Sequence, residues 1–267
     1  MKAGQSQRAA RFGARALGLV IGPALLAFGL SRCSETTAPV ERRVSGAEIT
    51  VGQGTARAEL IITRTSLPVS LAVVLTEGAL SGLPSTMPGP EFVLPLPTEA
   101  ASLPFNHVTL NWNPGGHPPA GIYDKPHFDI HYYLITPAQR DAIAPADPQF
   151  AAKTARLPAA DQIPANYAGD PFAIPRMGVH WFSPTAPERQ NQAFAQSFLY
   201  GFYDGSMIFL EPMVTVAFLQ THPDVTVDLA QPARYPKPGL YPTRNGVKYD
   251  AARREFRIEL SAFVARN

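Results

Sequence analysis

One short segment of this chain separates its side chains into an apolar row and a row that could do chemistry. The segment runs from residue 125 to residue 135 and is rich in the aromatic and β-branched residues typical of strands. Because side chains alternate faces along a strand, one face would be apolar and the other would carry imidazoles, a carboxylate and a phenol. Such groups can bind a metal ion, transfer a proton or hold a polar ligand. The apolar row is Phe128, Ile130, Tyr132 and Leu134; the polar row is His127, Asp129, His131 and Tyr133.

Two later segments carry groups of the same kind in apolar surroundings. His180 lies between Val179 and Trp181, and Glu211 ends an apolar run just before a proline. A buried carboxylate without a partner is costly, so Glu211 needs one, and His180 could be that partner or a ligand beside it. The combined nitrogen and oxygen set suits Zn, Mn, Fe or Ni. The predicted metal ligands are His127, His131 and His180, with Glu211 and Asp129 as the catalytic carboxylates.

Strand geometry restricts how the two histidines of the first segment could act together. Residues four apart on a regular strand lie roughly 13 Å from each other, so His127 and His131 would share one metal ion only with difficulty. Either a bulge after Pro126 brings His127 closer, or one histidine binds while the other is peripheral. In the second case Asp129 could accept the remaining ring N–H of the ligating histidine.

Other residues could complete a pocket around these groups. His117 lies in a Gly- and Pro-rich turn, where it is either a ligand delivered by a loop or an exposed side chain. The pocket residues predicted are His117, Tyr123, Asp124, Tyr133 and Trp181. The sequence has no nucleophile elbow, phosphate-binding glycine loop or dinucleotide fingerprint. A metal site, a metal-free polar pocket and a structural hydrogen-bond network all remain open.

The first 32 residues have the order of a secretory signal. Four basic residues between positions 2 and 15 precede the apolar run of residues 16–30, which is short for a membrane-spanning helix of roughly 20 residues. The end of the run resembles the lipobox of bacterial lipoproteins, in which Cys33 would be lipidated, although Arg32 departs from that pattern. Ordinary export and an uncleaved anchor are the alternatives. Cys33 is the only cysteine, so the mature part has neither an intramolecular disulfide nor a thiolate zinc cluster.

Net charge and signal together predict where the protein acts and with what. Residues 1–32 hold five of the 23 basic residues and none of the 21 acidic ones, so the rest of the chain carries a net charge of −3. No basic surface for nucleic acid is therefore expected. The expected location is the cell envelope outside the cytoplasm, lipid-anchored, periplasmic or secreted. A homo-oligomer is an open possibility, since Phe198, Tyr200, Phe202 and Tyr203 could form an aromatic surface.

The predicted architecture is mainly β, a single antiparallel sandwich or jelly-roll-like barrel with a few short helices. Twenty-eight prolines argue for many short elements joined by turns. Strands are predicted within residues 49–62, 69–75, 92–96 and 108–112, and hairpins at Asp204–Gly205 and between residues 241–249 and 255–260. Residues 212–222 are ambiguous: Pro212 and Pro223 suit a helix, which we favour, whereas Val214, Thr215 and Val216 suit a strand. The domain prediction is a signal peptide at 1–32, a tether at 33–46 and a β-rich domain at 47–267, with a short-helix insertion at about 137–176.

Seven short motifs are distinctive in combination. They are Gly116–Pro119, Ile122–Asp124, Pro126–Asp129, His131–Tyr133, Gly178–Trp181, Tyr203–Gly205 and Phe209–Met213. In these motifs the chain resembles a bacterial domain-of-unknown-function family of small exported or lipid-anchored β-rich proteins. The resemblance implies one extracytoplasmic domain that can self-associate and has these histidines as its polar centre. It implies no activity.

The sequence therefore leaves two kinds of function open. One is an exported protein whose His- and carboxylate-lined pocket binds a divalent metal, zinc or similar, or a small ligand. As an enzyme it would be a metal-assisted hydrolase or isomerase, with a metal-bound water and Glu211 or Asp129 as the base. The other is a non-enzymatic envelope scaffold that self-assembles, in which the histidines only tie loops together.

Overall fold

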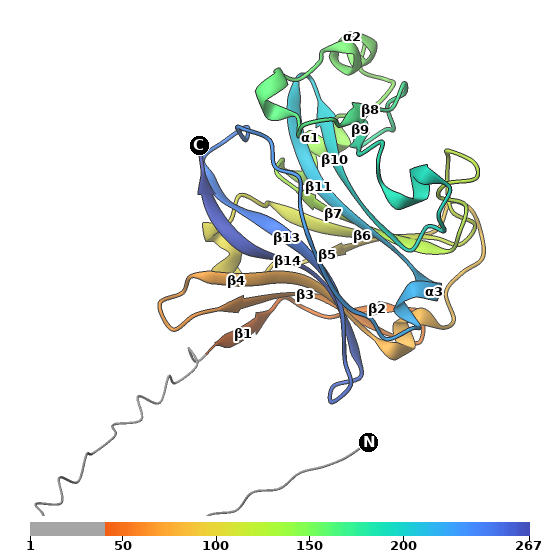
Figure 1. Cartoon of the computed structure of the whole chain (residues 1–267), viewed down its shortest axis with the longest axis vertical. Helices are drawn as coiled ribbons and strands as arrows, with labels where there is room; N and C mark the ends of the chain where they lie inside the picture. Colours follow the sequence, from red (N-terminus) through yellow and green to blue (C-terminus); the bar gives the residue numbers. More distant parts are fainter. Residues whose placement is uncertain (1–40) are drawn as a thin grey trace, which may run out of the picture. The chain divides into compact units, whose positions relative to one another are not determined.

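The protein is built from two antiparallel β-sheets. The computed structural model describes residues 41–267, which form two sheets of seven strands each and three short α-helices (Figure 1). The predicted mainly β, antiparallel sandwich is confirmed. The predicted signal peptide, Cys33 and most of the predicted tether lie outside the described residues.

The first sheet contains both ends of the described chain. Its strand order is β1-β3-β4-β14-β13-β12, and β2 also pairs with β3. Val44 pairs with Leu60 and packs on the core, so the last residues of the predicted tether at 33–46 belong to the sheet instead. The strands are β1 (Arg42–Ser45), β2 (Ile49–Val51), β3 (Gly54–Ile62), β4 (Pro68–Thr76), β12 (Asp224–Asp228), β13 (Gly239–Asp250) and β14 (Glu255–Arg266).

The second sheet carries most of the histidines and carboxylates that could bind a metal ion or transfer a proton. Its strand order is β5-β6-β7-β11-β10-β9-β8. The strands are β5 (Glu91–Leu94), β6 (His107–Asn113), β7 (His127–Tyr133), β8 (Ala168–Gly169), β9 (Val179–Phe182), β10 (Gln196–Tyr203) and β11 (Ser206–Thr215). The helices are α1 (Pro137–Asp141), α2 (Phe150–Ala155) and α3 (Val216–Leu219), with 3₁₀ turns η1 (Glu77–Leu80), η2 (Thr98–Ser102), η3 (Ala160–Gln162) and η4 (Pro187–Gln190).

The main core lies between the two sheets, and β7 contributes its apolar row to it. Phe128, Ile130 and Tyr132 are completely buried in one cluster with Val73 and Ile258 of the first sheet. Tyr132 also donates its phenolic hydrogen to the carbonyl oxygen of Ile258 at 3.2 Å. Burying one face of β7 in this way turns the polar row to the opposite face of the second sheet.

The two predicted hairpins are confirmed, and the predicted helix at 212–222 is largely wrong. Asp204 and Gly205 join β10 to β11 with φ angles of 55° and 75°, as a tight hairpin turn requires. β11 continues through Pro212 to Thr215, and only four residues of α3 follow. Proline has no backbone N–H to donate to a neighbouring strand. Pro212 fits within β11 because it pairs with Phe198 of β10 at a point where the pairing between β11 and β7 is interrupted.

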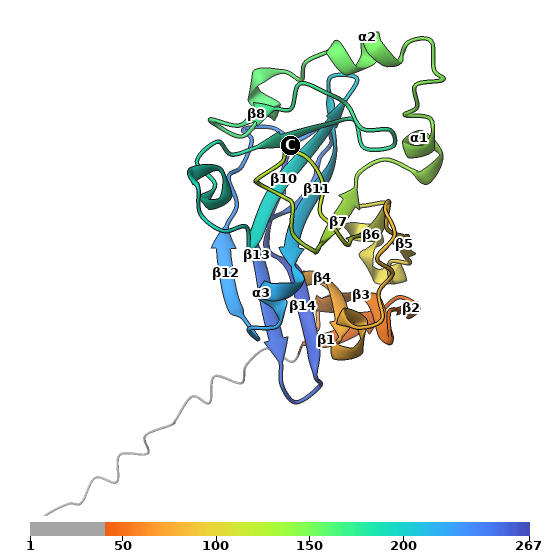
Figure 2. The ribbon, with the colours of Figure 1, turned by 90° about the vertical axis from the view of Figure 1, so that its right-hand side faces the viewer.

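The predicted insertion covers one end of the second sheet. Figure 1 shows α1, α2, β8 and β9 beyond β10 and β11, away from β3 and β4, and Figure 2 shows α1, α2 and β8 at the same end. Thr136 caps α1 through a reciprocal pair of hydrogen bonds with Gln139, and α2 begins at Phe150. Within residues 41–267, no helix has the length and apolar character needed to cross a membrane.

Candidate metal centre

Strand pairing in the second sheet brings His131, His180 and Glu211 together. β11 pairs with β7 so that Leu210 faces Tyr132, and the same register sets Glu211 opposite His131. β10 separates β11 from β9 and has a glycine, Gly201, opposite His180. His131 Nε2 is 3.3 Å from Glu211 Oε1, and His180 Nε2 is 3.4 Å from Glu211 Oε2. All three side chains are buried.

These close approaches are those of ligands around a common point. Atoms bonded to one tetrahedral ion at 2.0–2.2 Å lie about 3.4 Å apart. Neither contact has hydrogen-bond geometry, and His131 Nε2 and Glu211 Oε2 are buried without a hydrogen-bond partner. Buried polar atoms are rarely left unpaired. The three ligand atoms lie within 4.8 Å of one another, so this set could hold a metal ion.

A chain of hydrogen bonds on β6 fixes the tautomer of His131. The Thr109 hydroxyl donates to Asn111 Oδ1 at 3.1 Å, and the Asn111 amide donates to Glu91 Oε2 at 3.4 Å. Thr109 has no second hydrogen for His131 Nδ1, which lies 3.5 Å away, so the imidazole donates from Nδ1. This leaves the Nε2 lone pair free, the form in which histidine binds metals.

Burial keeps this set uncharged. Loss of hydration lowers the pKa of His131 to about 3 and that of His180 to about 4, so both are neutral imidazoles at pH 7. Burial, reinforced by the negative charges of Asp129 and Asp170, raises the pKa of Glu211 well above its usual range. A bound cation would reverse that effect on Glu211 and displace its proton.

A second set lies further along β7 and includes a residue from the preceding loop. His127 Nε2 is 3.0 Å from Asp129 Oδ1, and His117 Nε2 is 3.4 Å from Asp129 Oδ2. His127 and Asp129 are buried, whereas the His117 side chain is 28% exposed. These three residues could also hold a metal ion. Burial opposes ionisation of Asp129, but His127 and His117 outweigh it and lower the pKa of that carboxyl.

The predicted ligand set is thus divided. His127 belongs with His117 and Asp129, while His131 and His180 belong with Glu211. β7 is regular at this point, with Phe128 and Tyr132 paired on both neighbouring strands, so no bulge brings His127 to His131. The two histidines do not share one set because residues four apart on a regular strand lie roughly 13 Å from each other.

Both sets border one cavity of about 220 Å³. His117 and Asp129 of the second set line it, as do His180 and Glu211 of the first. The rest of the wall is largely apolar and includes Trp112, Tyr123, Phe172, Ile174, Met177 and Leu199. Part of that wall, residues 170–177, comes from the insertion.

The other predicted pocket residues have different positions. Tyr123 is buried and lines the cavity, and burial raises its pKa to about 12. Tyr133 is buried beneath the site, stacked on His131 with ring centroids 5.6 Å apart. Asp124 is exposed and accepts a hydrogen bond from the amide of Gly121. Trp181 faces away from the cavity, because it alternates with His180 on β9.

Several polar residues of the site were not predicted. Asp170 lines the cavity, and Asn113 donates to Asp129 Oδ2 at 2.7 Å. Thr109, Asn111 and Asn113 alternate along β6, which is the pattern that identified the polar row of β7. Asp170 lies in the insertion, where no periodic pattern marks it.

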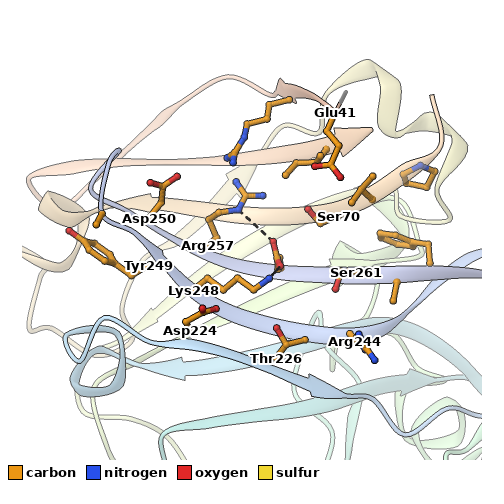
Figure 3. A pocket seen from close by; sticks show the side chains of 18 residues that line it. Glu41, Ser70, Asp224, Thr226, Arg244, Lys248, Tyr249, Asp250, Arg257 and Ser261 are labelled. Carbon is orange, nitrogen blue, oxygen red and sulfur yellow. Dashed lines mark hydrogen bonds and ion pairs between the residues drawn. The ribbon is translucent and has the colours of Figure 1, made fainter. Parts of the chain in front are cut away.

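A larger hollow lies on the outer face of the first sheet and has a different character. Figure 3 shows Arg257 and Lys248 directed toward one carboxylate on this face. Both residues form ion pairs with Glu259, at 3.5 Å from Arg257 Nε and 2.6 Å from Lys248 Nζ. The volume of the hollow is about 940 Å³. No histidine lines this hollow among the described residues. The groups that could hold a metal ion therefore lie on or beside the second sheet.

Comparison with known proteins matches one short segment of the chain to a family of unknown function. Residues 68–112 match the model of a family described as TTHB210-like, hypothetical protein TTHB210. No curated protein and no solved structure matches the chain. The matched residues extend from β4 into β6 and end before His117, so the seven motifs singled out in the sequence lie outside the match.

Proposed function

We propose that this protein is a metal-dependent hydrolase whose ion is held by His131, His180 and Glu211. The observation that carries the proposal is that His131 Nε2 and His180 Nε2 lie 3.3 and 3.4 Å from the two carboxylate oxygens of the buried Glu211 without hydrogen bonds to them. Two imidazoles and one carboxylate are a ligand set of catalytic zinc sites, in which a further position holds water. His180 and Glu211 line the cavity, so that water would face a bound substrate.

The cavity favours a small neutral substrate. Its volume is below the roughly 300–1,000 Å³ of pockets for drug-sized ligands. No arginine or lysine lines the cavity among residues 41–267, so it offers no guanidinium or ammonium group to bind a phosphate. The small, largely apolar cavity therefore favours a small ester, lactone or amide as the substrate class.

Asp170 is the carboxylate best placed to act as the base. Glu211 is a proposed ligand, and Asp129 already accepts from Asn113 and contacts two histidines. Asp170 lines the same cavity, and partial burial raises its pKa toward the range useful for proton transfer at neutral pH. This role replaces the one expected for Glu211 or Asp129.

Metal uptake tests the first part of the proposal. Chelator-stripped full-length protein is dialysed against Zn²⁺, Mn²⁺, Fe²⁺ or Co²⁺, and bound metal is measured by elemental analysis. We expect His180→Ala and Glu211→Gln each to lose one ion per chain relative to the unmodified protein. His222→Ala is the matched control, because that ring stacks on Tyr249 away from both sets. Equal uptake by His180→Ala and the control would refute the site.

Hydrolysis of 4-nitrophenyl acetate by the metal-loaded protein tests the second part. Asp170→Asn should retain the ion and lower the rate by about 10²-fold or more, the usual contribution of a positioned base. 4-Nitrophenyl phosphate should not be hydrolysed. Metal uptake without any metal-dependent ester hydrolysis would contradict a hydrolase.

We place this activity outside the cytoplasm. The support is the signal-like order of residues 1–32, with Cys33 as the lipid attachment site in the anchored form. Radiolabelled palmitate incorporation, compared between the unmodified chain and Cys33→Ser, would distinguish an anchored protein from a secreted one.

A further inference from the structure

We infer that a second metal ion binds His117, His127 and Asp129 and holds the loop of residues 114–126 against β7. This ion would be separate from the one proposed at Glu211. The inference extends the proposed function, because the second ion would hold in place a loop that lines the same cavity. The two sites would lie roughly 6–7 Å apart, because Asp129 and His131 are two residues apart on one strand.

The backbone fixes the tautomers of both histidines in this set. His127 Nδ1 is 2.6 Å from the carbonyl oxygen of Lys125, and His117 Nδ1 is 2.8 Å from that of Pro118. A carbonyl oxygen can only accept, so each ring must donate from Nδ1. In the neutral form each Nε2 is then a lone pair turned toward the oxygens of Asp129.

When both rings are neutral, their two Nε2 lone pairs and the oxygens of Asp129 face one another, and a positive charge between them would offset the repulsion. His127 Nε2 and Asp129 Oδ1 are 3.0 Å apart but do not have hydrogen-bond geometry, and both atoms are buried without any other partner. His127 is completely buried and Asp129 is 5% exposed, so water does not readily replace the missing partner. A cation bound to all three residues satisfies every one of these atoms at once.

The loop is shaped to deliver His117 to this point. Gly116 has a φ of 73°, and a Cβ there would lie 2.0 Å from the carbonyl oxygen of Tyr123, so only glycine fits. The amide of His117 donates to the same carbonyl at 3.1 Å, which closes the loop on itself. Pro118 and Tyr123 of this loop line the cavity. An ion bound to His117 would therefore fix one wall of the cavity to the sheet.

The test counts Zn²⁺ ions bound by the full-length chain after chelator stripping and reloading. We expect two per chain for the unmodified protein and for His222→Ala, and one for His117→Ala. His127→Ala should also bind one, but its ring is completely buried, so substitution of the partly exposed His117 is less disruptive to the fold. Hydrogen exchange gives a second readout: zinc should slow exchange in residues 114–124 of the unmodified protein at least tenfold, and not in His117→Ala.

The ion count separates this inference from the proposed function. One ion that is lost in His180→Ala and kept in His117→Ala would overturn the second site and leave the first. One ion that is lost in His117→Ala and kept in His180→Ala would support the second site and overturn the first. No bound ion would overturn both.

Discussion

Thr109 fixes which nitrogen of His131 carries the proton, although it touches neither the proposed ion nor the cavity. Its hydroxyl is committed to Asn111, so it accepts from His131 Nδ1 and directs the free Nε2 toward Glu211. Thr109→Val keeps the shape of the side chain and removes that acceptor. We expect zinc affinity to fall about 10- to 100-fold, the usual effect of losing a partner behind a metal ligand.

Competition with a chromogenic chelator measures that change. Thr109→Ser retains the hydroxyl and should bind zinc within about threefold of the unmodified protein, since the hydrogen-bonding group is unchanged. If Thr109→Val bound zinc as tightly as Thr109→Ser, the proposed control of the His131 tautomer would be incorrect.

For single residues, the sequence indicated which side chains belong to the site better than it indicated which of them contact one another. Alternation along residues 127–133 identified the polar row correctly, because one face of β7 packs on the core. The pairing of Glu211 with His180 could be proposed from their shared apolar surroundings. The partnership of His127 with His117 could not, because it depends on how a loop folds back. Asp170 gave no signal, since its role depends on the position of the insertion.

Among the elements, β10 positions the site through a residue that lacks a side chain. A Cβ on Gly201 would lie 2.1 Å from the ring of Phe209, so only glycine allows that ring to lie across β10. Phe209 in turn contacts His131 and His180, with ring centroids 4.8 and 5.3 Å away. The missing side chain therefore makes room for the ring that supports both histidines.

Gly201→Ala should disturb both stability and metal binding. Displacing a buried ring in a packed site costs roughly 1–3 kcal/mol, and moving Phe209 would shift both imidazoles. Urea unfolding and zinc titration together measure the two effects. Gly115→Ala is the control, because the nearest atom to its Cβ would be 3.9 Å away. A Gly201→Ala protein with unchanged stability and affinity would show that Phe209 does not hold the histidines in place.

The elements themselves were predictable where local chemistry decides them. Asp204–Gly205 specified its hairpin through the positive φ angles that the turn requires. The helix predicted after Glu211 was largely wrong. Pro212 and Pro223 are typical of the ends of a helix, whereas Val214 and Thr215 suit a strand. Tertiary pairing with β10 decided in favour of the strand.

Across the whole molecule, buried histidines make stability depend on acidity. Burial lowers the pKa of His107 and His180 to about 4 and that of His131 to about 3. Each is neutral in the folded protein but takes up a proton at about pH 6.5 when unfolded. Their stabilisation is therefore present above pH 6.5 and is lost as the pH falls from 6.5 toward 4. The pKa of Glu211 is raised, so this residue lowers the free energy of unfolding as the pH rises above 4.5.

For chelator-stripped protein between pH 4.5 and 6.5, the three histidines bind up to three more protons in the unfolded state than in the folded state, and Glu211 binds up to one fewer. The unfolded state therefore binds at most about two more protons than the folded state. One proton corresponds to about 1.4 kcal/mol per pH unit, so the free energy of unfolding should rise with pH by at most about 2.8 kcal/mol per unit. His107→Phe tests the assignment, because it keeps a ring stacked 4.7 Å from Tyr133 and lies outside both metal-binding sets. Urea unfolding at several pH values should give a slope lower by about 1.4 kcal/mol per unit for this variant. If the two slopes were equal, His107 would not be a source of the acid sensitivity, and the dependence would have to arise from the metal-binding residues alone.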